Sequence, residues 1–245
     1  MRTLSRLVTT GFCLVLLPGC APEEGGDAPD VQEQGAATRP VEATSLLGEP
    51  LRRPGIPDET RATYEANLED ALVERAANPD DPDAWVWVGR RQAYLGRYQD
   101  AIETFTEGGE RWEDDPRFLR HRGHRRITIR ELSAAQADLE AAQVIIDLSR
   151  MPDQVEPDGL PNARGIPVST LHSNVRYHLA LSRYLLGDFE GAEVQWAQDV
   201  EAAVNPDMVV ASSYWLWLTR MRLGRSEEAR QVLAGIDADM DIIEN

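Results

Sequence analysis

The chain shows a pattern of small and apolar positions that repeats every 34 residues. Three pairs of positions are separated by this interval: Gly89 and Gly123, Ala101 and Ala135, and Phe105 and Leu139. Small residues let two helices approach closely, and larger apolar residues fill the space between neighbouring helix pairs. A period of about 20–50 residues is typical of stacked repeats in which each unit packs only against its neighbours. The pattern therefore predicts an all-α fold of stacked helix pairs.

The first of these units carries further residues at positions typical of a known repeat. They are Trp85, Gly89, Leu95, Gly96, Tyr98, Ala101 and Phe105. Together they resemble the tetratricopeptide repeat (TPR), whose consensus has a tryptophan, a Leu-Gly pair, a Gly-x-Tyr turn, an alanine and a phenylalanine. The resemblance implies helix-turn-helix repeats stacked into a right-handed α-solenoid. It also implies that the first helix of each repeat lines a concave groove, and that the protein binds a partner rather than catalysing a reaction.

Helix start signals divide this part of the chain into a leading helix and four repeats. Three starts pair an N-cap residue with a proline, at Asp81-Pro82, Asp115-Pro116 and Asn205-Pro206. The expected elements are a helix over 58–77 and repeats over about 82–115, 116–148, 169–204 and 206–238, within a helical domain over 58–245. The second repeat departs from the pattern, because Arg122 stands where an apolar residue is usual and Arg130 replaces the turn glycine.

An insertion over 149–168 separates the second repeat from the third. Its four prolines are Pro152, Pro157, Pro161 and Pro167. No helix can run through this spacing, and a long non-helical loop in a compact domain is usually functional or disordered. Apolar residues such as Val155 and Ile166 leave two interpretations open: the insertion binds a partner, or it packs into the superhelix. The stretches 157–164 and 170–174 resemble a segment of a group of bacterial tetratricopeptide proteins, and this resemblance implies no activity.

The end of the sequence lacks a clear polar capping helix, which stacked repeats normally need. Residues 242–245 follow the fourth repeat directly. Either this end packs back on the fold, or a partner covers it, or the chain is shortened.

The amino terminus has the organisation of an export signal. Arg2 and Arg6 precede an apolar run over 7–17, which is too short to span a membrane as a helix. The run ends in Leu17-Pro18-Gly19-Cys20, which resembles the lipobox of bacterial lipoproteins.

The lipobox resemblance implies a lipid anchor in the bacterial cell envelope. Residues 1–19 would be removed as a signal peptide, and the Cys20 thiol would carry a diacylglycerol that holds the protein on a membrane. Ala21 follows the cysteine, and this favours the periplasmic face of the outer membrane in a cell with two membranes. Residues 20–57 contain few large apolar side chains, so we expect the lipidated cysteine to be followed by a flexible tether.

The composition and the motifs of the chain argue against several classes of partner and cofactor. The formal net charge is −17, so nucleic acid, which requires a basic surface, is not expected as a partner. The two cysteines are Cys13 and Cys20, so the helical domain has no disulfide framework. We expect no catalytic residue, cofactor or metal, because the chain has no glycine-rich phosphate loop and no Gly-x-Ser-x-Gly motif.

The helix expected at the start of the second repeat is unusually basic. No acidic residue lies between Arg117 and Arg130, in a chain with 42 acidic and 25 basic residues. Basic side chains in the groove can clamp an acidic segment or the C-terminal carboxylate of a protein or peptide partner. The candidate partner-binding residues are Arg90, Arg120, His121, His124, Asn174, Tyr177 and His178.

Internal pairing is the alternative role for these arginines. The acidic residues available on adjacent helices are Glu103, Glu107, Asp138 and Glu140. Their carboxylates could neutralise the basic helix, while the arginine stems cover apolar surface.

Two hypotheses of function follow. The first is a membrane-anchored TPR interaction scaffold of the cell envelope without catalysis. The second is an envelope enzyme or a small-ligand or metal-binding protein that uses the Arg- and His-rich residues of 117–130 and 172–178. A metal site has less support, because the histidines lack the spacing of known zinc motifs and the nearby arginines repel a cation.

Overall fold

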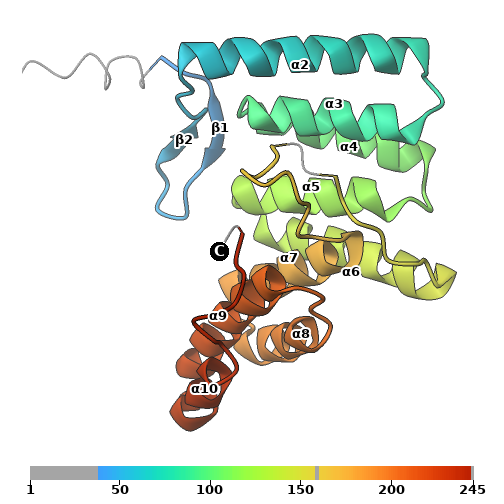
Figure 1. Ribbon diagram of the computed structural model, residues 1–245. Coiled ribbons are helices and arrows are strands. Elements are labelled where there is room, and N and C mark those ends of the chain that lie inside the picture. Colours follow the sequence, from blue (N-terminus) through green and yellow to red (C-terminus); the bar gives the residue numbers. More distant parts are fainter. Residues whose placement is uncertain (1–37, 158–159, 244–245) are drawn as a thin grey trace, which may run out of the picture.

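The structure is a computed structural model that describes residues 38–157 and 160–243. The predicted signal peptide, Cys20 and the first part of the predicted tether lie outside the described residues. Within them, a β-hairpin precedes nine helices (Figure 1). The elements are β1 (Val41–Thr44), β2 (Pro50–Arg52), α2 (Asp58–Ala77), α3 (Pro82–Tyr94), α4 (Tyr98–Arg111), α5 (Pro116–Thr128), α6 (Leu132–Ser149), α7 (Leu171–Leu186), α8 (Phe189–Glu201), α9 (Pro206–Arg222) and α10 (Ser226–Leu233).

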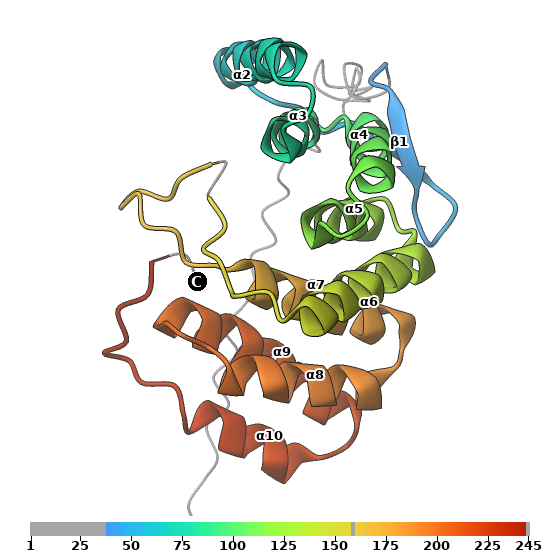
Figure 2. The same cartoon turned by 90° about the vertical axis from the view of Figure 1, so that its right-hand side faces the viewer.

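Four helix pairs follow α2, and each pair packs on the next (Figures 1 and 2). The pairs are α3–α4, α5–α6, α7–α8 and α9–α10. The first helices of the pairs, α3, α5, α7 and α9, also contact one another in that order. This arrangement confirms the predicted fold, an all-α solenoid of helix-turn-helix repeats interrupted between α6 and α7.

Short polar side chains start the first helices of the repeats. Asp81, Asp115 and Asn205 are the N-caps of α3, α5 and α9, and each accepts a hydrogen bond from a backbone N–H of the first turn. Proline follows each cap, at a position where the backbone N–H has no partner within the helix. α7 begins instead with a capping box formed by Thr170 and Ser173.

Glycines make room for aromatic rings between the helices. A Cβ atom on Gly89 would collide with the ring of Phe105, and one on Gly108 would collide with the ring of Phe118. Phe105 is 1% exposed and Phe118 is 0% exposed. Burying such a side chain stabilises the fold by about 1.5–3 kcal/mol. The small and aromatic residues that recur in the sequence are therefore residues that contact one another between helices.

The turn between α5 and α6 repeats the turn between α3 and α4 without its glycine. Gly96 and Arg130 both have a φ of 71°. This left-handed conformation costs a residue with a Cβ atom about 1–2 kcal/mol, whereas glycine adopts it freely. Arg130 compensates in part, since its Nη1 donates hydrogen bonds to the carbonyl oxygens of Thr128 at 2.7 Å and Ile127 at 3.2 Å.

The flexible tether predicted for 20–57 is corrected by the structure for residues 38–57. β1 and β2 form an antiparallel hairpin, and Glu42 of β1 is 6% exposed. Glu42 accepts hydrogen bonds from Arg53 at 2.6 and 3.0 Å and from the backbone N–H of Gln99 at 3.1 Å. Because Gln99 lies in the first turn of α4, the carboxylate satisfies a free helix N–H and interacts favourably with the helix dipole. Polar contacts thus hold a segment that has few apolar residues.

The C-terminal segment packs back on the fold as far as residue 243. The backbone N–H of Ile243 donates to both carboxylate oxygens of Asp207 at 3.1 Å, at the start of α9. Asp241 accepts hydrogen bonds from Arg164, between α6 and α7, at 2.8 and 3.1 Å. Among the described helices, none is both long enough and apolar enough to cross a membrane.

Candidate partner-binding site

The insertion predicted over 149–168 corresponds in the structure to residues 150–157 and 160–170, which connect α6 to α7 and keep that name below. The insertion lies on the side of the stack formed by α3 and α9, whereas the β-hairpin lies on the other side, next to α4 (Figure 2). Its two arms pair with each other. The Glu156 N–H donates to the Ser169 carbonyl at 3.1 Å, and the Leu171 N–H donates to the Gln154 carbonyl at 2.9 Å. The insertion therefore packs on the side that the first helices of the repeats line.

Glu156 is the main contact between the insertion and the basic helix α5. Its side chain is buried, and its Oε2 lies 3.1 Å from Arg120 Nη2 and 2.6 Å from Asn174 Nδ2. Its Oε1 lies 3.0 Å from His121 Nε2. Arg120 also donates from Nη1 to His121 Nδ1 at 2.8 Å, so the ring proton of His121 is on Nε2, the ring nitrogen nearest the carboxylate. Three side chains from two helices thus hold one carboxylate.

Burial and charge set the protonation of this group. Burial, and then the positive charge of Arg120, lower the pKa of His121 to about 3, so this ring is neutral at neutral pH. Burial by itself raises the pKa of Glu156, but Arg120 and His121 together lower it well below its ordinary value. The site therefore contains a charged carboxylate, a neutral histidine and a charged guanidinium.

A cavity of about 140 Å³ lies beside these residues, between α3 and α5. It is lined by Arg90, Ala93, Tyr94, Phe105, Arg120, His121, His124 and Arg125. Arg90 Nη2 donates to the Pro157 carbonyl of the insertion at 2.7 Å and lies 3.3 Å from the Tyr94 hydroxyl. Arg90 thus contacts the insertion one residue after Glu156.

Histidines and aromatic residues continue the site onto α7. The rings of His124 and His178 lie 4.1 Å apart, centre to centre. His178 Nδ1 donates to the Asn174 carbonyl at 2.7 Å, and burial lowers the pKa of His178 to about 3. The Tyr177 hydroxyl accepts a hydrogen bond from Trp215 Nε1 at 2.7 Å, and the Tyr177 ring packs on Trp196. Tyr177 is therefore part of the packing between α7, α8 and α9.

The structure thus places the predicted site residues in two settings. Those that lie around the insertion or the cavity are Arg90, Arg120, His121, His124, Asn174 and His178. Tyr177 also lies near the insertion, beside Val168 and Ser169, but its hydroxyl is engaged by Trp215.

Two other arginines of α5 form ion pairs within the protein, as the alternative interpretation of the basic helix expected. Arg122 donates to Asp138 at 2.7 and 2.9 Å, and Arg126 donates to it at 2.8 Å. Asp138 is 4% exposed, so this network joins α5 to α6. Glu140 pairs with Arg183 of α7 rather than with an arginine of α5.

Sequence reasoning missed two residues of the site, Glu156 and Arg125. A signal for Glu156 was present, since the insertion carries acidic residues and α5 between Arg117 and Arg130 has none. Arg125 was hidden among the neighbouring arginines, and its place at the cavity depends on how α3 and α5 pack.

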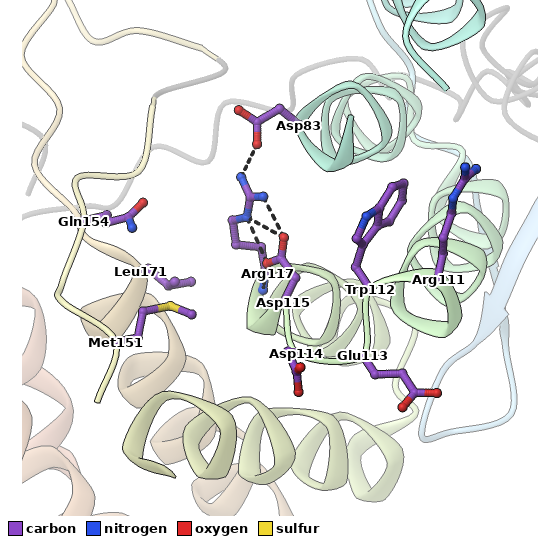
Figure 3. Close-up of a pocket in the computed structure, with 10 residues that line it drawn as sticks. All are labelled: Asp83, Arg111, Trp112, Glu113, Asp114, Asp115, Arg117, Met151, Gln154 and Leu171. Atoms are coloured by element: carbon purple, nitrogen blue, oxygen red, sulfur yellow. Dashed lines mark hydrogen bonds and ion pairs between the residues drawn. The ribbon is translucent and has the colours of Figure 1, made fainter. Parts of the chain in front are cut away.

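Figure 3 shows a second cavity, of about 680 Å³, near the starts of α3 and α5. Its lining residues are Asp83, Arg111, Trp112, Glu113, Asp114, Asp115, Arg117, Met151, Gln154 and Leu171. Arg117 forms ion pairs with Asp83 and Asp115, and Arg111 pairs with Asp80. The lining of this cavity carries more acidic than basic side chains, so its charge disfavours an external carboxylate.

No metal centre stands out in 38–157 or 160–243, where no group of three or more His, Cys, Asp or Glu side chains could hold a metal ion.

Comparison with solved structures identifies the fold. A crystal structure of MamA has a TM-score of 0.54 and 15% identity over 72% of this chain and 88% of that one. MamA (41-end) from Desulfovibrio magneticus RS-1 gives 0.53 and 16% over 72% and 85%. A thermophilic TPR protein from Thermus thermophilus gives 0.51 and 19% over 74% and 87%. No family model and no curated protein matches the sequence. The chain has a TPR-type fold.

Proposed function

We propose that this chain is a non-catalytic interaction scaffold of the bacterial cell envelope that binds a carboxylate-bearing segment of a partner protein. A TPR-type stack supports this, because stacked repeats present an extended concave surface for binding. The observation that carries the proposal is the position of Glu156. The carboxylate of an extended segment lies among donors from Arg120, His121 and Asn174.

The donors around Glu156 define what a partner segment must offer. Both oxygens of the carboxylate lie within 3.1 Å of side-chain nitrogens, and Arg90 binds the main-chain carbonyl of the next residue, Pro157. Hydrogen bonds that involve a charged group are about twice as strong as neutral ones. An acidic side chain in an extended partner segment presents the same two groups, whereas a C-terminal carboxylate presents the carboxylate alone. The insertion and the partner therefore compete for one set of donors.

Peptide binding tests this proposal on the full-length chain purified in detergent. The probe is a labelled synthetic peptide with the sequence of residues 152–157, Pro-Asp-Gln-Val-Glu-Pro. The chain variant Glu156→Gln should bind it at least tenfold more tightly than the wild type, because the internal competitor has lost its charge. Adding Arg90→Ala to that variant should weaken binding again.

The matched probe carries glutamine in place of the glutamate of the peptide. Equal affinity for the two peptides in fluorescence anisotropy would show that the carboxylate is not recognised. Peptides that end in glutamate are then compared with a free and with an amidated terminus. Weaker binding of the amidated peptide would show that the C-terminal carboxylate is recognised, and equal binding that the side-chain carboxylate is recognised.

Lipid anchoring at Cys20 is the second part of the proposal. It is supported by the lipobox-like Leu17-Pro18-Gly19-Cys20 and the preceding apolar run. Two or more acyl chains are needed for stable attachment to a bilayer. In a cell with two membranes, we place the protein on the periplasmic face of the outer membrane. The variant Cys20→Ser should move from the membrane to the soluble fraction and lose the mass of the acyl groups; unchanged fractionation would refute the anchor.

A further inference from the structure

The cavity between α3 and α5 contains more positive charge than the protein neutralises. Arg90, Arg120 and Arg125 line it, and the lining includes no aspartate or glutamate. Glu156 pairs with Arg120 from the side of the insertion. Arg125 forms no ion pair with any carboxylate in the described part of the chain, and its guanidinium lies 5.8 Å from the centre of the Tyr98 ring.

The same residues include a buried donor without an acceptor. Arg120 is 8% exposed, and its Nε has no hydrogen-bond partner among the described residues. Its two other nitrogens are directed to Glu156 and to His121. A buried N–H that lacks an acceptor destabilises the folded chain, and more so when the group is charged. Burial, and then the charge of Arg120, also lower the pKa of Arg125 to about 10. The folded chain thus holds these cations at a cost.

The volume of the cavity limits what can compensate that charge. The cavity measures about 140 Å³, well above the roughly 10–15 Å³ that one water molecule needs. A group of a few heavy atoms fits in this space. Phe105 and Ala93 supply apolar wall, which strengthens electrostatic attraction to a small charged ligand.

We propose that this cavity binds a small free oxyanion, of the phosphate or short carboxylate type, through Arg125, Arg120 and Arg90. The site shares Arg120 and Arg90 with the contact to the insertion, but Arg125 belongs to the cavity alone, and the ligand needs no partner protein. Arginine suits this role, because its guanidinium presents several N–H donors in a plane that matches the geometry of phosphate and carboxylate.

The proposal predicts opposite effects of one substitution on stability and on binding. Arg125→Met removes an unneutralised cation from a cavity with an apolar wall. It should therefore raise the melting temperature in the absence of ligand and abolish the response to ligand. A purely structural arginine would give the reverse, because its loss would lower the melting temperature and leave no ligand response to abolish.

Titration of the full-length chain in detergent tests this inference. Inorganic phosphate, acetate and succinate are added separately, each against sodium chloride of matched ionic strength, and followed by calorimetry and thermal unfolding. We expect saturable binding of one phosphate or one carboxylate ligand per chain, with a rise in melting temperature that exceeds that in chloride. Arg125→Met and Arg90→Met should both lose this response. Arg230→Met, at an exposed residue of α10 paired with Glu227, should keep it.

The outcomes separate this inference from the proposed partner. No saturable binding in the wild type, a response equal to that in chloride, or a response retained by Arg125→Met would each overturn the oxyanion site. Saturation by acetate or succinate alone would assign the ligand to the carboxylates, and saturation by phosphate alone to the phosphates. Failure of the 152–157 peptide to bind would refute the proposed partner segment and leave these titrations unaffected.

Discussion

Replacing Glu156 by glutamine removes one charge from the contact between the insertion and α5 and leaves the shape of the side chain. In the wild type, this carboxylate lies within 3.1 Å of Arg120, His121 and Asn174. Glutamine can still accept a hydrogen bond from Asn174. It cannot neutralise Arg120, which stays buried beside the other arginines of the cavity.

The structure indicates how large the effect is and where it appears. Removing one partner of a fully buried ion pair costs about 3–5 kcal/mol if the other partner stays buried. The middle of the insertion, however, buries little apolar surface, since Val155 is 63% exposed and Leu160 is 52% exposed, whereas Val168 and Met151 near its ends pack on the helices. Opening the insertion would let water reach Arg120 without unfolding the helices. We therefore expect local opening to become easier by about 2 kcal/mol, and the global free energy of unfolding to fall by less than about 1.5 kcal/mol.

Amide hydrogen exchange measures the two quantities separately. The reporters are the N–H groups of Glu156 and Leu171, which are hydrogen-bonded across the base of the insertion. A change of about 2 kcal/mol corresponds to roughly a 30-fold faster exchange at these amides. Asp241→Asn is the matched control, because it removes the same charge from an exposed ion pair with Arg164 of the insertion. It should leave the exchange of both reporters unchanged.

A different result would refute this account of the insertion. If the reporter amides exchange as in the wild type while the global free energy of unfolding falls by about 3 kcal/mol or more, Glu156 belongs to the cooperative core. The insertion could not then yield to a partner segment.

Three further predictions concern the fold and its response to pH. Arg130→Gly should raise the free energy of unfolding by about 0.5–1 kcal/mol in urea titration, because glycine relieves the left-handed strain but gains freedom in the unfolded chain; a lower value would contradict the strain. Glu42→Ala should lower it by about 2 kcal/mol, since Arg53 and the first turn of α4 lose their acceptor, and unchanged stability would show that the hairpin is not held by this contact. Burial lowers the pKa of both His121 and His178 to about 3, so an unfolded chain binds protons below about pH 6.5 that the folded chain does not. The free energy of unfolding should therefore be highest above that pH and fall by about 1.4 kcal/mol per pH unit and per histidine as the pH decreases towards about 3. A free energy of unfolding that does not change between about pH 6.5 and 4 would mean that these rings are not buried as neutral groups.

Patterns along the sequence predict much of the fold. The 34-residue spacing of Gly89 and Gly123 reflects the packing of one helix pair, and it can be read without knowing any contact. Asp81 and Asp115 bond to N–H groups two residues ahead in the chain. Cap and helix are local, so the sequence alone contains the information for both.

The candidate site was partly predictable for the same reason. The first helices of TPR-like repeats line the concave side, so the residues on them could be named as candidates. The sequence did not show which arginines are neutralised by acidic side chains. Asp138 takes Arg122 and Arg126, whereas Arg120 is met by Glu156, and Arg125 has no carboxylate partner in the described residues. These differences depend on side-chain directions around α5.

The sequence by itself determined the repeat, its helix starts and the break between the second and third repeats, because each rests on a periodicity of residue types or on residues close together in the chain. Only the tertiary structure decided the hairpin and the role of the insertion. Glu42 reaches Gln99 across 57 residues, and Glu156 of the insertion reaches back to Arg120 of α5. No periodicity encodes such contacts, since the free energy of a polar contact depends on the burial and the partners that the whole fold supplies.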